Sequence, residues 1–310
     1  MSALPLAAAP FPLAGELSAA LSALMWGSAG IVIARIQPPL TAGAINYGKN
    51  LFATLCFIGL LWAVTGSPLP QELHGQTLWI FVISGFLGLA LCDTFLMRSL
   101  LDIGPQRMST VFLCVPAMAS LIAILPPLSE HASWQVWVGI AVCMGGIFLA
   151  LRRHPDHHVD AARFRRGVRN AFIAAIFQTA AILLARYGLH KVQAPLLESA
   201  VVRMAAGTLG LVLIGGAAGR LGSWHRQLSV PKSAAMLFGA SFFGTFLGIL
   251  TNQAGLLWAV HAGVATTLNS LMPIYLMPLS VIYLGERFGK RAVIATIIAF
   301  IGVALMMIGS

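Results

Sequence analysis

The sequence predicts an all-α integral membrane protein with ten transmembrane helices in two inverted five-helix repeats. Composition is the first indication, since 58% of the residues are hydrophobic and only 9% are charged, whereas a soluble domain carries about 25% charged residues. The mean hydropathy of +0.87 agrees with this class. Because the sequence lacks the short alternating polar and apolar strands of outer-membrane barrels, the spans are expected to be helices.

Stretches without a formal charge locate the spans, because roughly 20 apolar residues form a helix that crosses the hydrocarbon core. The stretch 233–285 is too long for one helix, so we expect two helices there with a break near His261–Gly263. The seventh span is expected to begin before its charge-free stretch, near Pro195. The stretches that predict one helix each are 17–34, 51–71, 73–92, 108–129, 132–151, 170–185, 204–219 and 292–310.

Basic residues predict the orientation. In this topology all but three of the 19 lysines and arginines fall on one side, and the three exceptions are Arg186, Lys191 and Arg203. By the positive-inside rule the basic side is cytoplasmic, so both termini are expected on the non-cytoplasmic side of the cell inner (plasma) membrane. The net charge of +10 is then explained by basic residues that set the orientation in the membrane, and we expect no nucleic-acid partner.

One polar linker, "RRHPDHHVDAARFRRGVR", divides the chain into two halves. We expect residues 14–152 to form the first five-helix repeat, 153–169 a basic cytoplasmic linker and 170–310 the second repeat. The histidines of "HPDHH" could bind a metal, but a solvated loop is the expected role, so no metal and no cofactor are predicted.

The ends of the two halves resemble each other. Residues 128–151 and 284–307 align without a gap at an offset of 156, which places Gly146 opposite Gly302. Further back, "FLGLAL" (86–91) matches "FLGILT" (246–251) at an offset of 160. Because five is odd, the second copy must enter the membrane from the other side. Inverted repeats recur in secondary transporters, which bind substrate near the midplane where the repeats meet.

The chain resembles the drug/metabolite transporter (DMT) superfamily, in particular its ten-helix EamA-type permeases. The motifs that carry the resemblance are a small-residue first span, "ALMWGSAG", and the segments "LCDTFLMRSLLDIGPQRMSTVFLCVP" and "HAGVATTLNSLMPIYLMPLSVIYLGE", each followed by a Gly-rich closing helix. The resemblance covers residues 14–309. One departure is "PPLSE", where the usual motif has Gly before Glu, as in "LGE" of the second half. The resemblance implies export or exchange of small metabolites.

The predicted function is secondary-active export or exchange of a small metabolite such as an amino acid by alternating access. The alternatives are a proton-coupled multidrug exporter and a non-transporting membrane scaffold. We expect no enzyme, because the sequence lacks a G-x-S-x-G nucleophile and paired intramembrane carboxylates, and no P-loop is present for ATP. Expected partners are a small-molecule substrate, the lipid bilayer and a coupled proton, in a monomer or homodimer.

Uncharged polar and aromatic residues inside the predicted spans are expected to line the substrate pocket. Individually each is more often a helix–helix hydrogen bond, but together they form a neutral, partly aromatic lining. The predicted substrate-binding residues are Trp26, Ser28, Asn46, Asn50, Gln178, Thr179, Asn252, Asn269 and Tyr275.

Five further residues are predicted to serve gating or coupling. Asp93 is expected near the cytoplasmic end of span 3, either as a protonatable gate or as an ion-pair partner of Lys49 or Arg107. Lys49 and Arg203 occupy comparable places in spans 2 and 7, so we expect them at opposite ends of the molecule, where they snorkel or meet an anionic group. The gating set is Asp93, Lys49, Arg203, Pro116 and Pro273, the two prolines being expected to allow kinks.

Overall fold

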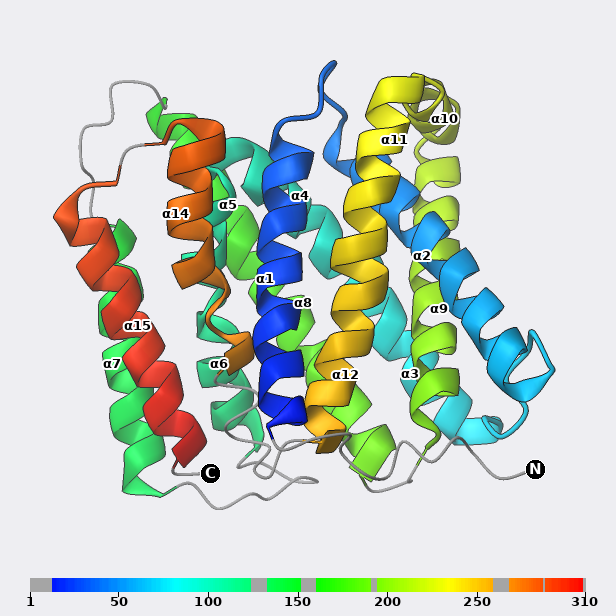
Figure 1. Ribbon diagram of the computed structural model, residues 1–310, viewed down its shortest axis with the longest axis horizontal. Helices are drawn as coiled ribbons and strands as arrows, with labels where there is room; N and C mark the ends of the chain where they lie inside the picture. The colour runs from blue at the N-terminus through cyan, green and yellow to red at the C-terminus, as the bar shows by residue number, and fades with distance from the viewer. Residues whose placement is uncertain are drawn as a thin grey trace.

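The computed structural model describes residues 13–123, 133–151, 160–190, 194–258, 268–286 and 288–308, and every regular element within them is a helix. Figure 1 shows a bundle in which most helices run between the same two ends of the molecule. Six helical segments are long and apolar enough to cross a membrane, and two shorter apolar helices accompany them. The predicted all-α membrane fold is confirmed.

The helices of each half follow in chain order. The first half contains α1 (Ala14–Ala34), α2 (Ala42–Thr65), α3 (Gly75–Gly85), η1 (Phe86–Cys92), α4 (Asp93–Ile103), α5 (Pro105–Phe112), α6 (Cys114–Ala123) and α7 (Trp134–Leu151). The second half contains α8 (Ala161–His190), α9 (Leu196–Ala217), α10 (Leu221–Leu228), α11 (Pro231–Ala240), η2 (Ser241–Leu247), α12 (Gly248–Trp258), α14 (Met272–Leu284) and α15 (Lys290–Ile308).

Several helices run past the charges at which the predicted spans end. Helix α2 begins at Ala42 rather than after Lys49, and the third span is continuous over Gly75–Ile103. Helix α8 begins at Ala161, inside the predicted linker. A charged residue does not end a transmembrane helix when its side chain has a partner or reaches the interface, because the backbone N–H and C=O groups remain hydrogen-bonded within the helix. The predicted break at His261–Gly263 and the "HPDHH" sequence lie outside the described residues.

Two π-helical segments, η1 and η2, interrupt the third span of each half. They start at Phe86 and Ser241, which corresponds to an offset of 155. This agrees with the offset of 156 between the closing helices. The offset of 160 inferred from "FLGLAL" and "FLGILT" is therefore wrong, because it shifts the third spans by about one helical turn. π-helical turns are rare and mark functional places in helices.

Each half packs its third span against the first two spans of the other half. The segment α3–η1–α4 contacts α8 and α9, and the segment α11–η2–α12 contacts α1 and α2. Glycines permit the close approach, since Gly88 faces Ala181 of α8 and Gly244 faces Ala29 of α1. Equivalent helices also meet, α2 against α9 and α7 against α15. The contacts between the halves thus come in pairs, as inverted repeats require.

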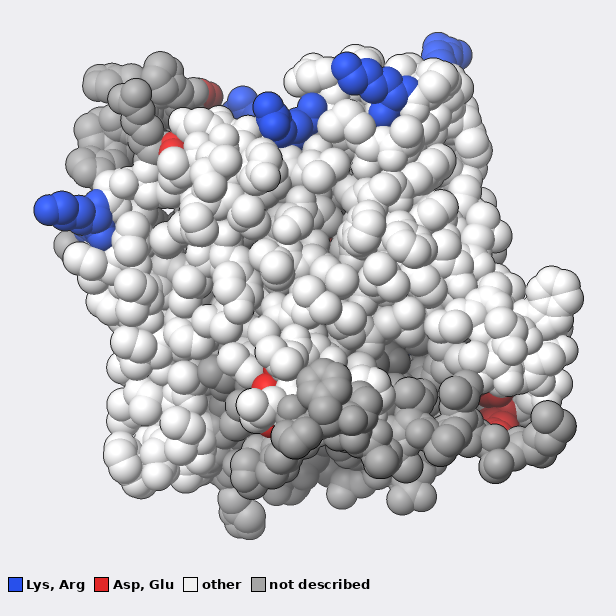
Figure 2. Space-filling view, viewed as in Figure 1, with Lys and Arg blue, Asp and Glu red and all other residues white. Residues whose placement is uncertain are grey.

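Charge is concentrated at one end of the bundle. Figure 2 shows lysine and arginine gathered toward the upper end, while the middle of the visible face is uncharged. The start of α1 and the end of α15 lie toward the opposite end (Figure 1). The distribution matches the positive-inside pattern expected of a multi-pass membrane protein.

We predict that Gly146→Leu lowers the apparent melting temperature of the detergent-purified protein by about 4–10 °C, because overpacking costs about 1–3 kcal/mol. A Cβ at Gly146 would meet the backbone of α15 at Ala295 and Ala299, so α7 and α15 could not stay in contact.

Gly145→Leu is the matched control, since a Cβ at Gly145 meets nothing within 4 Å. Equal melting temperatures of the two variants would contradict the packing of α7 on α15.

Candidate functional site

Two asparagine side chains of α2 hold η1 in place. Asn46 and Asn50 are fully buried. The Asn46 amide donates to the carbonyl oxygens of Leu89 and Ala90 at 2.9 and 3.2 Å. The Asn50 amide donates to Asn46 Oδ1 at 2.9 Å and to the Leu89 carbonyl at 3.0 Å. A wide π-turn takes carbonyls out of the α-helical pattern, and a carbonyl without a donor is costly in a bilayer. Asn46 and Asn50 were predicted to bind substrate, but their side-chain amide groups donate hydrogen bonds to backbone carbonyl oxygens of η1.

A buried ion pair adjoins this amide pair. Lys49 Nζ lies 2.5 Å from Asp93 Oδ2, and the two side chains are only 9% and 16% exposed. Lys49 also donates to Asn50 Oδ1 at 3.3 Å. Of the two partners expected for Asp93, the structure thus selects Lys49. A pair this deep is costly to break, because removal of one partner leaves the other charge uncompensated.

Asp93 lies deeper than the sequence indicated. It was expected close to the cytoplasmic end because Arg98 follows five residues later. The helix continues to Ile103, however, so Asp93 is ten residues, about 15 Å, from its end. Arg98 lies on the exposed side of that helix, with its guanidinium 5.2 Å from the centre of the Phe95 ring. The carboxylate is consequently inside the span and not at its end.

Arg203 of α9 reaches the same region from the other half. Its backbone lies against Gly85, and its Nη2 is 3.8 Å from the position of a Cβ on Gly88. Its Nε is buried and has no hydrogen-bond partner among the described residues. Asp93 attracts the guanidinium electrostatically. An unpaired buried guanidinium donor is rare in proteins, and it is a group that an anionic ligand would satisfy.

Lys49 and Arg203 are near the centre of the bundle, which corrects the expectation of opposite ends. Helices α2 and α9 cross where Thr54 Oγ1 and Thr208 Oγ1 form a hydrogen bond of 2.8 Å. These threonines have the same offset, 154, as Lys49 and Arg203, so they mark the pseudo-two-fold axis. Each cation precedes its threonine by five residues, about 7.5 Å along the helix. Both cations were expected at the ends of their helices because span 2 was expected to begin after Lys49, whereas α2 begins at Ala42.

Two more predicted residues lie at the contacts between the halves. Gln178 Oε1 is 3.6 Å from the Cβ position of Gly88, on the same glycine that Arg203 approaches. Trp26 Nε1 is 2.6 Å from the Cβ position of Gly248, so the indole packs directly against α12. We call Asn46, Lys49, Asn50, Asp93 and Arg203 the central polar cluster; Gln178 adjoins it.

The remaining predicted ligands are not part of this cluster. Ser28 lines a separate cavity. Thr179 is buried and donates to the Ala175 carbonyl of its own helix at 2.8 Å. Asn269 accepts a hydrogen bond of 2.9 Å from Ser22 of α1. The other two, Asn252 on α12 and Tyr275 on α14, are partly buried.

The two prolines occupy similar places. Pro116 is the third residue of α6, and span 4 breaks just before it, at Leu113, because proline cannot donate to Phe112 in α5. Pro273 is the second residue of α14, and the turn residues Ser270 and Leu271 separate that helix from the helical residues 268–269. Both prolines thus follow a break in their span, and Pro278 lies inside α14.

Sequence reasoning missed two features. The Thr54–Thr208 contact was detectable from its offset, which equals that of Lys49 and Arg203. The second feature is Glu198, whose two carboxylate oxygens accept hydrogen bonds from the backbone N–H groups of Gln71 and Glu72, each at 2.9 Å. Nothing in the sequence pattern pairs a helix start with a loop 126 residues earlier.

Comparison with known proteins gives a consistent result. The sequence model of the EamA-like transporter family matches residues 13–152 and 165–308. A protein of Archaeoglobus fulgidus named as an uncharacterized transporter is 36% identical over 87 residues. The aligned region is 29% of that relative's length and 28% of this chain. A crystal structure superposes with a TM-score of 0.62 at 12% identity, over 94% of this chain and 95% of that chain, so the two share a fold.

We predict that Lys49→Met lowers the apparent melting temperature by about 10 °C, because an unpaired buried carboxylate costs about 3–5 kcal/mol. Lys49→Met combined with Asp93→Asn should recover most of that loss, since neither side chain of the ion pair then carries a charge.

Lys290→Met, at the exposed start of α15, is the control and should melt like the wild type. Additive losses in the double variant would show that the two side chains are not coupled.

Proposed function

The chain belongs to the EamA-like transporter family, and we propose that it is a secondary-active transporter that exports or exchanges a small metabolite, such as an amino acid, by alternating access. The observation that supports this most is the central polar cluster, in which Lys49 pairs with Asp93 inside the third span and Arg203 of the other repeat reaches Gly88 of the same span. Ionisable groups inside a membrane are costly and are retained mainly for function.

The charges of the cluster indicate the class of substrate. Two cations face one carboxylate, so the cluster carries an excess positive charge. Lys49 is paired with Asp93 at 2.5 Å, whereas Arg203 has a buried donor without a partner among the described residues. A substrate carboxylate would supply that partner through charge-assisted hydrogen bonds. An amino acid also brings an ammonium group, which would compete with Lys49 for Asp93.

The position of the cluster favours alternating access. Lys49 lies on one side of the Thr54–Thr208 crossing and Arg203 on the other. A substrate between them would contact both repeats, so a rocking motion of one repeat against the other would expose it first to one side and then to the other. Asn46 and Asn50 position this machinery by holding η1, rather than by touching the substrate.

The charge distribution favours a particular orientation. We infer that the basic end in Figure 2 faces the cytoplasm of the cell inner membrane and that both termini face outward. The proposal requires no enzymatic reaction, because the cluster contains cations, a carboxylate and amides already bonded to the backbone, and the buried Arg203 Nε, which has no hydrogen-bond partner among the described residues, suits binding.

We predict that Arg203→Gln lowers export of carboxylate-bearing metabolites roughly tenfold or more, since a hydrogen bond to a charged group contributes about 1.5–3 kcal/mol. Untargeted metabolite analysis of the medium around expressing cells measures this. The variant should keep the wild-type melting temperature, because Arg203 Nε has no partner to lose.

Arg98→Gln removes the same charge from the exposed side of α4 and is the matched control. If the media around wild-type and Arg203→Gln cells were identical at equal protein abundance, the transporter proposal would fail and the scaffold alternative would stand.

A coupled proton would use Asp93, since it is the carboxylate of the cluster. We predict that reconstituted Lys49→Met/Asp93→Asn protein loses its response to a pH gradient, whereas Asp102→Asn, at the surface pair with Arg166, retains it. Vesicles with a fluorescent pH indicator make the measurement. A full pH response in the double variant would exclude Asp93 as the coupling group.

A further inference from the structure

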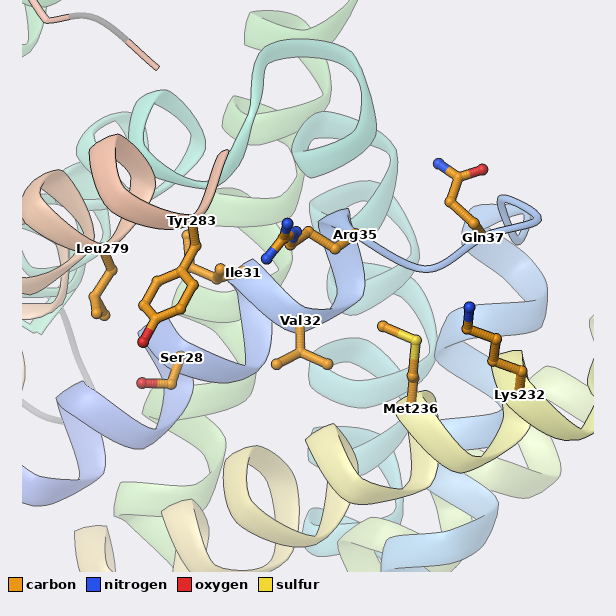
Figure 3. Close-up of a pocket in the computed structure, with 9 residues that line it drawn as sticks. All are labelled: Ser28, Ile31, Val32, Arg35, Gln37, Lys232, Met236, Leu279 and Tyr283. Atoms are coloured by element: carbon orange, nitrogen blue, oxygen red, sulfur yellow. The ribbon is translucent and has the colours of Figure 1, made fainter. Parts of the chain in front are cut away.

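A cavity separate from the central polar cluster opens between α1, α11 and α14. Its volume is about 580 Å³, within the roughly 300–1,000 Å³ typical of small-molecule sites. Figure 3 shows its lining, with side chains from three helices and the loop after α1 pointing toward a common space. The lining residues are Ser28, Ile31, Val32, Arg35, Gln37, Lys232, Met236, Leu279 and Tyr283.

The cytoplasmic end of this cavity, on our orientation, is positively charged. Arg35 ends α1, and Lys232 is the second residue of α11. Both side chains are exposed, and no acidic residue is among those that line the cavity. Within the described residues neither cation forms an ion pair; the surface and buried pairs belong to Lys49, Arg163 and Arg166. The cavity thus offers two cations to an anionic group.

The rest of the cavity is apolar and faces the lipid side of the bundle. Val32 and Met236 form one wall beneath the cations, as Figure 3 shows. On the helices that line the cavity and on η2, which follows α11, Ile282 and Phe243 are 71% and 57% exposed, which is the exposure expected of side chains that contact acyl chains. Figure 2 shows this face without charge until its upper edge, where lysine and arginine begin.

We propose that this cavity binds an anionic phospholipid of the cytoplasmic leaflet. The lipid phosphate lies at the mouth of the cavity, with Arg35 and Lys232 on opposite sides of it, and the first part of an acyl chain follows Val32 and Met236 toward Leu279. Basic pockets between helices at the cytoplasmic surface bind anionic head groups in this way. Tyr283, 50% exposed, places an amphipathic ring at the same level, as interfacial tyrosines do. The site is independent of what the central polar cluster transports.

The test titrates detergent-purified protein with phosphatidylglycerol, with phosphatidylcholine of the same chains, and with glycerol 3-phosphate, and follows the apparent melting temperature. We expect phosphatidylglycerol to stabilise the wild type. In Arg35→Gln/Lys232→Gln the midpoint should move about 25-fold higher, because each cation contributes about fivefold.

Arg220→Gln/Arg226→Gln removes two charges from α10, outside the cavity, and should behave like the wild type. Met236→Trp keeps both cations but fills the cavity, and it should lose the stabilisation by phosphatidylglycerol while melting like the wild type without lipid.

Three outcomes would overturn the proposal. If phosphatidylcholine raised the melting temperature as much as phosphatidylglycerol does, the negative charge of the lipid would have no role in binding. If glycerol 3-phosphate raised the melting temperature as much as phosphatidylglycerol does, the site would bind soluble phosphate compounds and not a lipid. Unchanged stabilisation in Met236→Trp, or an equal loss in the α10 control, would reduce the effect to general surface attraction.

Discussion

The structure depends on the high cost of leaving a backbone polar group without a hydrogen-bond partner in lipid. The π-helical segment η1 breaks the regular ladder of the third span, and the amides of Asn46 and Asn50 complete it. The same helix then supplies Lys49 to neutralise Asp93 directly after η1. A distorted helix, two amides and an ion pair therefore form one unit, and the position of each is set by the others. This unit also fixes α2 against α4, the wall from which the proposed substrate site is built.

The two repeats share a frame but not this unit. Both contain a π-helical segment, and in both a threonine hydroxyl donates back to a carbonyl there, Thr94 to Ala90 at 2.7 Å and Thr251 to Leu247 at 2.8 Å. At the offset of 155 between the two π-helical segments, however, the second repeat has Gly248 where the first has Asp93. The two repeats therefore have similar backbones, but only the first has a carboxylate directly after its π-helical segment. In the transport cycle that we propose, the repeats exchange roles structurally while the single carboxylate of Asp93 responds to substrate and protons.

The central polar cluster and the lipid-facing cavity differ in chemistry because they differ in surroundings. In the cluster, Arg203 packs against the third span of the other half, and its buried Nε has no hydrogen-bond partner within the described part of the chain, so an anion bound there would be held away from water. Around the cavity, Arg35 and Lys232 are exposed at the end of the bundle, where water and head groups screen them. The first site suits selective recognition of a small carboxylate, and the second suits looser attraction of a lipid phosphate.

The sequence by itself determined the helical membrane class, the family resemblance and the correspondence of the closing helices, which aligns Gly146 with Gly302, because hydropathy, charge-free length and repeats are properties of the chain alone. Of the candidate site it determined which residues stand out, Asp93 and Lys49 among them. Only the tertiary structure decided which of them meet. Counting charge-free residues ended span 3 too early and began span 2 too late, because a charge that finds a partner on another helix no longer limits its own helix. Partner choice is a property of the folded bundle, and no local pattern encodes it.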